Sequence, residues 1–590
     1  MTIAATFQYW NYFLELYQEQ LYYLTIGCAA VLIFAAPRPG NGSPHKSSFA
    51  LNQLLAIVAF GPTILGFVYS PTLESNPFTA RQYVFIPGLV AICLLLELIR
   101  RMLGVMVFLF VTVFVLYLFF GSYLPGLLET PVINPSSAVA ELIGSRGLVA
   151  YHNIVIWEMA LAALLGQLMS LSGGREWIRS VVQASGQKSR QTLIVLMLVL
   201  FVIPATVTSG AGSWFLILGP TLISGLVHSG IQKTRAAVLV FGFGAGAFLT
   251  PPIAGSVFFT VAEYTETPYV KLALAILPAC CLFYFLITTI SLNIRAEASS
   301  TDEGRFPLRE VLRGWGILVP VGTQMFLSLY TNQPKTGLVV AICAVILFMI
   351  HKEGFRQTGR TFLCGIEDAT RIVLVILAVL IVVSLFTTVL KLTGLGQTIA
   401  VLVVSEDGQS GNTLSAAITS LLLGTILPGA SSYVILFSQI GSDATLSQNL
   451  ALAISTFFSN YTPPIAIGCA LIAALAGVRY LQACLSAIRT LWPLLMIPYL
   501  MIYWPGLSLE GSAFTVVTAL LAVFAGAYLL TVSLTSPGWD KYGAFRFVIG
   551  VLLVTPFHTF LDTYLVSLCL VVVASVSLFV RAKQNRASQR

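Results

Sequence analysis

Apolar stretches long enough to cross a bilayer follow one another along most of the chain. A hydrocarbon core about 30 Å thick is crossed by roughly 20 apolar helical residues. Stretches of this kind lie at 21–36, 50–70, 82–99, 103–120, 154–171, 269–293, 314–331, 336–350, 372–391, 480–503, 514–533, 544–557 and 563–580. The pattern predicts an all-α polytopic membrane protein.

Two further apolar stretches, 234–264 and 447–476, are interrupted by the same pentapeptide, Thr-Pro-Pro-Ile-Ala, at 250–254 and 462–466. Proline removes a backbone N–H, clashes with the carbonyl four residues earlier, and disfavours helical geometry at the residue before it. We therefore predict two broken helices of common origin. Paired interruptions in two halves of a chain indicate the binding site of a transporter.

The two breaks leave polar backbone groups inside the membrane. The carbonyls of Ala247 and Phe248 in the first copy, and of Ser459 and Asn460 in the second, lose their usual donors. In hydrocarbon such groups persist only where protein, water or a bound ion satisfies them. We expect protein, water or a bound ion to satisfy these carbonyls.

An apolar hairpin with a small, polar tip precedes each broken helix. The hairpins, 192–229 and 412–442, are predicted to be re-entrant, because each must return to the side it enters for the basic residues to alternate correctly. The tips align without a gap, which pairs Gly210 with Gly429, Ala211 with Ala430, Ser213 with Ser432 and Trp214 with Tyr433. Each copy of the duplication thus includes a tip and a break.

Each copy extends to a span before its hairpin and a closing span after its break. The predicted repeats cover 140–295 and 361–505, and a cytoplasmic loop with two connecting spans, 296–360, separates them. Each repeat crosses the membrane three times and two spans lie between them, so parity inverts the second repeat. An interfacial helix with four spans occupies 1–125, and three spans with a basic tail occupy 506–590.

Composition and charge agree with a membrane location. Of 590 residues, 57% are apolar and 9% are charged, and the mean hydropathy is +0.90. The net charge of +8 does not indicate nucleic-acid binding, because the basic residues, including the C-terminal tail, gather on one side of the predicted topology, which marks the cytoplasm. The exceptions are Arg81, Arg146, Lys271, Lys335 and Lys391 outside, and Arg489, whose side is ambiguous.

Three polar or aromatic side chains of the apolar stretches allow both a structural and a functional interpretation. Glu97 is expected to pair with Arg100 or Arg101 one turn on, a structural role. We favour an Arg489 side chain that reaches the cytoplasmic edge over one that contacts substrate. Trp214 could line a substrate cavity, but an aromatic side chain on an apolar helix more often packs in the core.

The hairpin tips and breaks resemble the large membrane subunit of TRAP (tripartite ATP-independent periplasmic) transporters. The resemblance includes Phe-Phe-Thr-Val-Ala-Glu at 258–263 and Pro-Tyr-Leu-Met-Ile-Tyr-Trp-Pro at 498–505, and it covers roughly 20–510. The chain looks like the fused permeases, in which a four-span small subunit precedes the large one, of the branch served by TAXI-type binding proteins.

The resemblance implies an elevator-type secondary transporter in the bacterial inner membrane, with a cytoplasmic C-terminus. It implies sodium-driven import of a small organic anion, expected to be a dicarboxylate, from a periplasmic binding protein. The chain departs from the family at both tips. Trp214, Phe215 and Leu216 replace the usual polar run, and Ile-Leu-Pro-Gly-Ala-Ser-Ser at 426–432 replaces Gly-Leu-Pro-Thr-Thr. These differences leave the predicted architecture unchanged but bear on which substrate and which ion the protein binds.

The candidate site residues combine the tips with the breaks. Sodium is a hard cation best held by oxygen, and helices that begin inside the membrane offer N–H groups to a carboxylate. The ion candidates are Ser209, Gly210, Ser213, Ala247, Thr250, Pro251, Gly429, Ser432, Ser459, Thr462 and Pro463. The substrate candidates are Ser209, Gly210, Gly212, Ser213, Thr250, Gly429, Ser431, Ser432, Asn460 and Thr462. Two repeats predict two or more sodium ions.

Two other classes of protein remain as alternatives. An intramembrane enzyme with Ser209 or Ser213 as nucleophile would need a base within reach, but the five histidines fall in loops or at the ends of segments. A passive channel could also contain inverted re-entrant hairpins. We expect coupled transport and no enzymatic activity.

Overall fold

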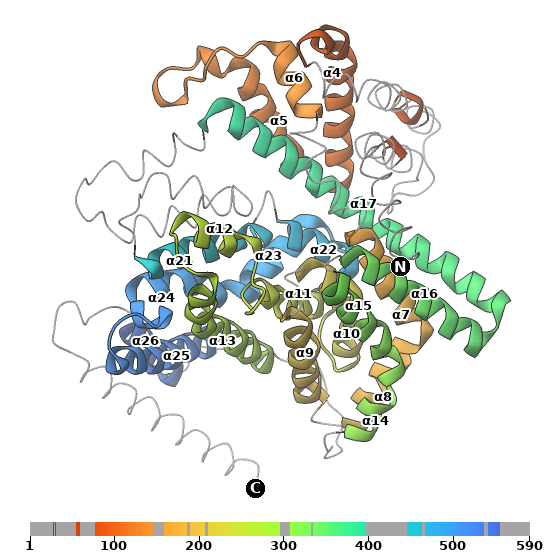
Figure 1. Ribbon diagram of the computed structural model, residues 1–590, viewed down its shortest axis with the longest axis vertical. Coiled ribbons are helices and arrows are strands. Elements are labelled where there is room, and N and C mark those ends of the chain that lie inside the picture. The colour runs from red at the N-terminus through yellow and green to blue at the C-terminus, as the bar shows by residue number, and fades with distance from the viewer. Residues whose placement is uncertain are drawn as a thin grey trace. The chain divides into compact units, whose positions relative to one another are not determined.

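The computed structural model describes residues 27–28, 30, 53, 55–58, 77–144, 158–185, 189–206, 211–294, 307–331, 334–395, 398, 445–462, 466–535 and 541–554. Within these ranges every regular element is a helix (Figure 1). Six of the described helices are long and apolar enough to cross a membrane. The prediction of an all-α polytopic membrane protein is confirmed.

The chain forms two compact units. The first comprises 1–157 and 371–399, and the second comprises 158–370 and 400–590. The predicted interfacial helix, most of the spans at 21–36 and 50–70, the hairpin at 412–442 and the span at 563–580 lie outside the described residues.

Three helices of the first unit pack together. They are α4 (Pro77–Met102), α5 (Val105–Phe120) and α6 (Pro135–Ile143), and α4 contacts both of the others. Glu97 on α4 accepts from Arg100 at 2.6 Å and from Arg101 at 2.8 Å. The predicted pairing is confirmed, and it neutralises a carboxylate next to an apolar span.

A single helix, α17 (Phe355–Thr393), continues from the second unit into the first. The sequence predicted a span only over 372–391, because the preceding turns carry charged residues that interrupt the apolar run. The helix nevertheless begins directly after Gly354, whose φ of +76° is readily adopted by glycine. Within the first unit, Phe386 on α17 packs against Phe110 and Phe114 on α5, with ring centroids 5.4 and 4.6 Å apart.

Most of the predicted first repeat, 140–295, lies at the beginning of the second unit, which starts at Glu158. Its elements are α7 (Leu161–Met169), a π-helical turn (Ser170–Gly174), α8 (Arg175–Ser185), α9 (Ser189–Ala205), α10 (Ala211–His228), α11 (Lys233–Ala245), α12 (Ser256–Tyr264) and α13 (Tyr269–Asn293). α13 has the bounds predicted for the first closing span. α9 and α10 pack together as the two arms of the first hairpin, and the residues between them, 207–210, lie outside the described ranges.

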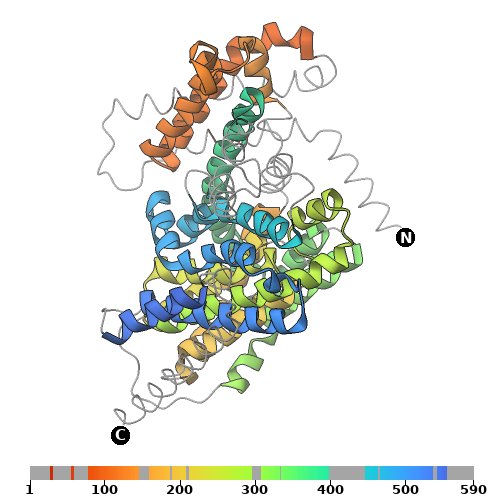
Figure 2. The ribbon, with the colours of Figure 1, turned by 90° about the vertical axis from the view of Figure 1, so that its left-hand side faces the viewer.

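The connecting helices and the end of the chain complete the second unit. The connecting helices are α14 (Leu308–Arg313), α15 (Trp315–Thr331) and α16 (Pro334–Glu353), and the last two pack together. At the other end α25 (Ala513–Thr535) packs against both α26 (Lys541–Val554) and α13 (Figure 2, dark blue and yellow-green).

The described part of the second repeat follows the same order as the first. It consists of α21 (Leu446–Thr456), α22 (Ile467–Ala476), α23 (Tyr480–Leu491) and α24 (Met496–Tyr503). The predicted closing span 480–503 has the right bounds but is not one regular helix. A 3₁₀ turn, Trp492–Leu495, separates α23 from α24, because Pro493 cannot donate to the carbonyl four residues earlier.

The first hairpin packs against α7 through a backbone contact at Gly166. A Cβ atom at Gly166 would lie 2.0 Å from the carbonyl oxygen of Leu216 on α10. A neighbouring backbone cannot move away as a flexible side chain can, so only glycine fits here. Small residues allow membrane helices to approach closely in this way.

We predict that Gly166→Ala destabilises the protein by about 1–3 kcal/mol, the usual cost of overpacking. Gly322→Ala on α15 is the matched control, because a Cβ atom there meets nothing within 4 Å. Thermal unfolding of the two purified variants in detergent measures the difference. Equal midpoints for both variants would contradict the packing of α7 against α10.

Candidate functional site

The first break begins with a tightened turn and ends seven residues later. α11 ends at Ala245 and continues as a 3₁₀ turn, Gly246–Phe248, and α12 begins at Ser256. The hydroxyl of Thr250 donates to the carbonyl of Gly246 at 2.7 Å. The helix is therefore interrupted at the predicted place.

The second break repeats this local structure. α21 passes into a 3₁₀ turn, Phe457–Asn460, and α22 begins at Ile467. The hydroxyl of Thr462 donates to the carbonyl of Phe458, four residues earlier, at 3.0 Å. Each threonine thus supplies a donor to a carbonyl near its proline pair, and its oxygen keeps two lone pairs.

The Phe248 carbonyl loses its usual helical donor, as predicted, and the protein supplies another. The loop folds back after the prolines, so the amide of Gly255 donates to the Phe248 carbonyl at 2.8 Å. The Ala247 carbonyl accepts a long bond of 3.4 Å from the amide of Thr250. The protein itself thus satisfies part of the backbone that the break exposes.

A tyrosine at the start of each closing span holds the loop that follows each break. The Tyr269 hydroxyl donates to the carbonyl of Pro252 at 2.8 Å and accepts from the amide of Ala254 at 3.0 Å. In the second copy Tyr480 hydrogen-bonds the backbone of Ala466, the residue that corresponds to Ala254. Sequence reasoning missed this pair, although a tyrosine near the start of both closing spans was a visible signal.

The two breaks lie against each other. The ring of Phe248, in the first 3₁₀ turn, stacks on that of Phe457, in the second, with centroids 4.6 Å apart. Phe241 on α11 meets Tyr461 edge-on at 5.5 Å. Gly468 on α22 permits this contact, because a Cβ atom there would lie 2.2 Å from the Phe241 ring.

The halves of the broken helices pair crosswise. α11, the first half of one helix, contacts α22, the second half of the other, and α12 contacts α21 (Figure 1). Two helices whose first and second halves pair in this way run antiparallel. The arrangement agrees with the inversion that parity and charge predict.

The first hairpin adjoins the second break. Phe215 on α10 meets Phe241 edge-on, with centroids 5.2 Å apart, and a Cβ atom at Gly212 would lie 3.6 Å from Leu471 on α22. The first turn of α10, which contains Gly212 and the half-buried Ser213, is therefore placed beside the second repeat. Trp214 is 2% exposed, in agreement with a packing role.

The threonines that begin the two repeated pentapeptides have different surroundings. The Thr250 hydroxyl has the hydroxyl of Tyr284 at 3.1 Å and the thiol of Cys280 at 3.7 Å. Near Thr462 the Asn460 amide nitrogen donates to the Phe457 carbonyl at 2.9 Å, which leaves its oxygen as an acceptor. Among the described residues, the first threonine thus has more of its hydrogen-bonding capacity filled.

An orphaned polar group lies beside the second break. The Tyr461 hydroxyl is buried and has no hydrogen-bond partner among the described residues. An unsatisfied buried hydroxyl costs about 1–3 kcal/mol. A ligand or ion at this break would find a polar atom that needs a partner.

Several candidate site residues lie outside the described residues, namely Ser209, Gly210, Gly429, Ser431, Ser432 and Pro463. Ser459 is described only in its backbone, within the second 3₁₀ turn. The described residues contain no group of three His, Cys, Asp or Glu side chains that could hold a metal. A cation at the described part of the breaks would be held by hydroxyl, amide and carbonyl oxygens.

Comparison with known proteins assigns the family. Residues 90–507 match the family described as "Tripartite ATP-independent periplasmic transporter, DctM component". The match covers well over half of the chain, so the chain belongs to this family. No curated protein matches it. The protein is therefore a multi-pass membrane component of a tripartite secondary transporter of organic acids, which works with a periplasmic binding protein.

The matched range covers both broken helices, the first hairpin and the closing spans, but it begins inside α4. The four-span small subunit predicted for 1–125 is therefore not part of what the family match shows. Its fusion to the large subunit stays a prediction.

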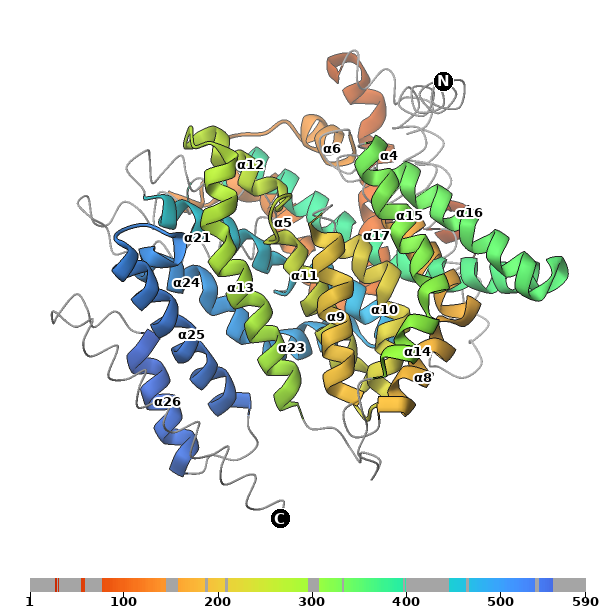
Figure 3. The same cartoon turned by 60° about the horizontal axis from the view of Figure 1, so that its bottom comes forward.

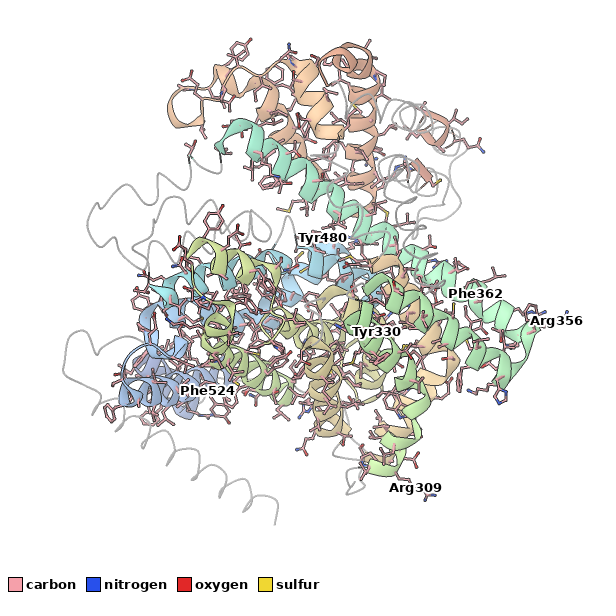
Figure 4. All side chains as sticks on the ribbon, in the orientation of Figure 1. Arg309, Tyr330, Arg356, Phe362, Tyr480 and Phe524 are labelled. Carbon is pink, nitrogen blue, oxygen red and sulfur yellow. The ribbon has the colours of Figure 1, made fainter. Side chains whose placement is uncertain are left out.

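We predict that Tyr269→Phe lowers the free energy of unfolding by about 1 kcal/mol, because it removes both hydrogen bonds to the loop after the first break. Uptake of substrate should fall as well, since the loop loses its fixed position. Tyr330→Phe on α15 is the control, because Tyr330 is 80% exposed (Figure 4). Thermal unfolding and uptake by reconstituted protein check the prediction, and identical behaviour of the two variants would exclude a positioning role for Tyr269.

Proposed function

We propose that this protein couples sodium entry to the import of a small organic anion, with dicarboxylates as the first candidates. A periplasmic binding protein, of the TAXI type according to the sequence resemblance, delivers the anion. The observation that carries the proposal is the contact between two equivalent breaks, Phe248 against Phe457. This contact supports the proposal because each break carries candidate oxygen ligands of its own repeat.

The breaks supply ligands of the kind that sodium prefers. The hydroxyl of each repeated threonine, Thr250 and Thr462, donates a hydrogen bond to a carbonyl. The lone pairs of its oxygen remain available to a cation. The second break adds the Asn460 amide oxygen and the buried Tyr461 hydroxyl. We propose one sodium site at each break, completed by the hairpin tips, with the second site formed more fully by groups that still lack partners.

An anionic substrate would bind between the tips and the breaks. No Lys or Arg occurs in the first tip, 207–218, or in either repeated pentapeptide, so a carboxylate must be held by other groups. The first amides of α10 have no partners within the helix and carry its positive dipole end. With the Ser213 hydroxyl and the sodium ions, they would neutralise a carboxylate.

The transport movement we propose is that of an elevator. The hairpins and broken helices would carry the substrate, while the N-terminal spans, the closing spans and the spans between the repeats would stay fixed. The distribution of basic residues supports a cytoplasmic C-terminus in this proposal. Each half of the transport cycle would then expose the same site to a different side of the inner membrane.

The direct test is uptake of a labelled dicarboxylate into proteoliposomes, with and without the binding protein. We expect accumulation that requires an inward sodium gradient and the binding protein. Uptake that is unchanged when choline replaces sodium would exclude sodium coupling. Equilibration without accumulation would favour a channel, and release of a hydrolysed product would favour an enzyme.

A second test concerns the oxygen ligands. Ser213→Ala at the start of α10 should raise the sodium concentration for half-maximal uptake about tenfold, equivalent to about 1.4 kcal/mol of lost binding, with little change in stability. Ser229→Ala at the other end of this hairpin arm is the control, since its hydroxyl only donates to the Leu226 carbonyl. Unchanged sodium dependence in Ser213→Ala would remove this residue from the ion site.

A further inference from the structure

A polar cavity lies away from the breaks, where α11 begins and α13 ends. Its volume is about 770 Å³, and in Figure 3 the three helices that form most of its wall, α11, α13 and α23, lie side by side. The polar residues that line it are Gln232, Thr234, Arg235, Asn293, Arg479, Gln482, Ser486, Arg489 and Thr490. All of them belong to the second unit.

Three arginines from two distant parts of the sequence converge on this cavity. Arg235 comes from the first turn of α11, Arg479 precedes α23, and Arg489 lies in the last turn of α23. The lining contains no Asp or Glu, and none of the three forms an ion pair with another described residue. Arg190 differs from them, because it donates to the carbonyl of Ile294.

The exposed face of α23 adds neutral polar side chains to the cavity wall. Gln482, Ser486 and Arg489 follow one another at helical spacing on the side that lines the cavity, whereas Ala483 and Ala487 are buried on the opposite side. The helix therefore presents a stripe of hydrogen-bond donors beside positive charge. Arg489, whose side the sequence left ambiguous, shares this cavity with two arginines predicted to be cytoplasmic.

Apolar side chains line the same cavity next to the polar groups. Leu481, Leu485 and Leu534 contribute to its wall and are 37%, 48% and 39% exposed. Exposed leucines of a membrane protein face acyl chains rather than water. A ligand that combines an anionic group with a hydrocarbon tail matches this wall better than a small hydrophilic anion does.

The ordinary explanation for exposed arginines at this level is the positive-inside bias combined with side chains that reach toward the interface. That explanation accounts for the charge of the three arginines. It does not explain why they converge on one cavity whose lining contains neutral hydrogen-bond donors and no acidic residue. Guanidinium groups bind phosphate oxygens through paired N–H donors. Basic pockets between membrane helices on the cytoplasmic side are places where lipid phosphates bind.

We propose that this cavity binds the phosphate of an anionic phospholipid from the cytoplasmic leaflet, held by Arg235, Arg479 and Arg489. The acyl chains lie along Leu485 and Leu534. The bound lipid bridges α11, which belongs to the first broken helix, and α23, which begins the closing span of the second repeat, and so stabilises their contact. The proposal does not depend on sodium coupling or on the identity of the transported anion.

The test uses purified full-length protein in a neutral detergent, without substrate or sodium, and follows thermal unfolding during titration with phosphatidylglycerol or phosphatidylcholine. We expect phosphatidylglycerol to raise the unfolding midpoint of the wild type more than phosphatidylcholine does. In Arg479→Gln/Arg489→Gln the apparent affinity for phosphatidylglycerol should be about tenfold weaker, as expected for the loss of charged phosphate contacts.

The matched control is Arg309→Gln/Arg356→Gln, which removes two exposed arginines from α14 and α17 (Figure 4) and leaves the cavity intact. It should respond to phosphatidylglycerol as the wild type does. Equal losses in the two double variants would reduce the effect to general surface charge and overturn the proposal. Full arginine-dependent stabilisation by inorganic phosphate or by a free dicarboxylate would overturn the lipid assignment.

Discussion

The structure depends on one constraint, which is that helices broken in hydrocarbon must find partners for the backbone groups they expose. The protein meets it in three ways. The loop after the first break folds back on the Phe248 carbonyl, a tyrosine from the closing span ties each loop, and each threonine donates to the carbonyl four residues earlier. The breaks then pack on each other through Phe248 and Phe457. Packing and backbone satisfaction thus hold the centre of the transport core.

Much of the described fold could be predicted because apolar length and proline position act locally. α13 has the predicted bounds, and both helices break at the repeated pentapeptide. The differences have physical causes. The helix α17 begins well before its predicted span, because charged turns interrupt the apolar run without interrupting the helix, and Pro493 divides a closing span that looks continuous in hydropathy. Parity predicted the inversion, with which the crosswise pairing of α11 with α22 and α12 with α21 agrees.

The candidate site was less accessible to sequence reasoning, because its partners are distant in the chain. The repeat identified Thr250 and Thr462, but not that Tyr284 and Cys280 lie beside the first of them. The ties from Tyr269 and Tyr480 join residues on different helices, and the orphaned Tyr461 hydroxyl follows from burial alone. Equal sequence thus gives two breaks that share a 3₁₀ turn and a threonine hydrogen bond. Among the described residues their polar surroundings differ, so we expect functional differences between the repeats.

The most direct test of the account is a cross-link between the two breaks. Phe248 and Phe457 are changed to Cys in a background without the native cysteines, and a protease site is inserted between 296 and 306. A short thiol cross-linker is then applied in native membranes. The account predicts that the two fragments stay joined after cleavage, as they should for the control pair Phe285→Cys/Phe524→Cys, whose rings are 5.5 Å apart. Fragments that separate at the breaks while the control pair stays joined would contradict it.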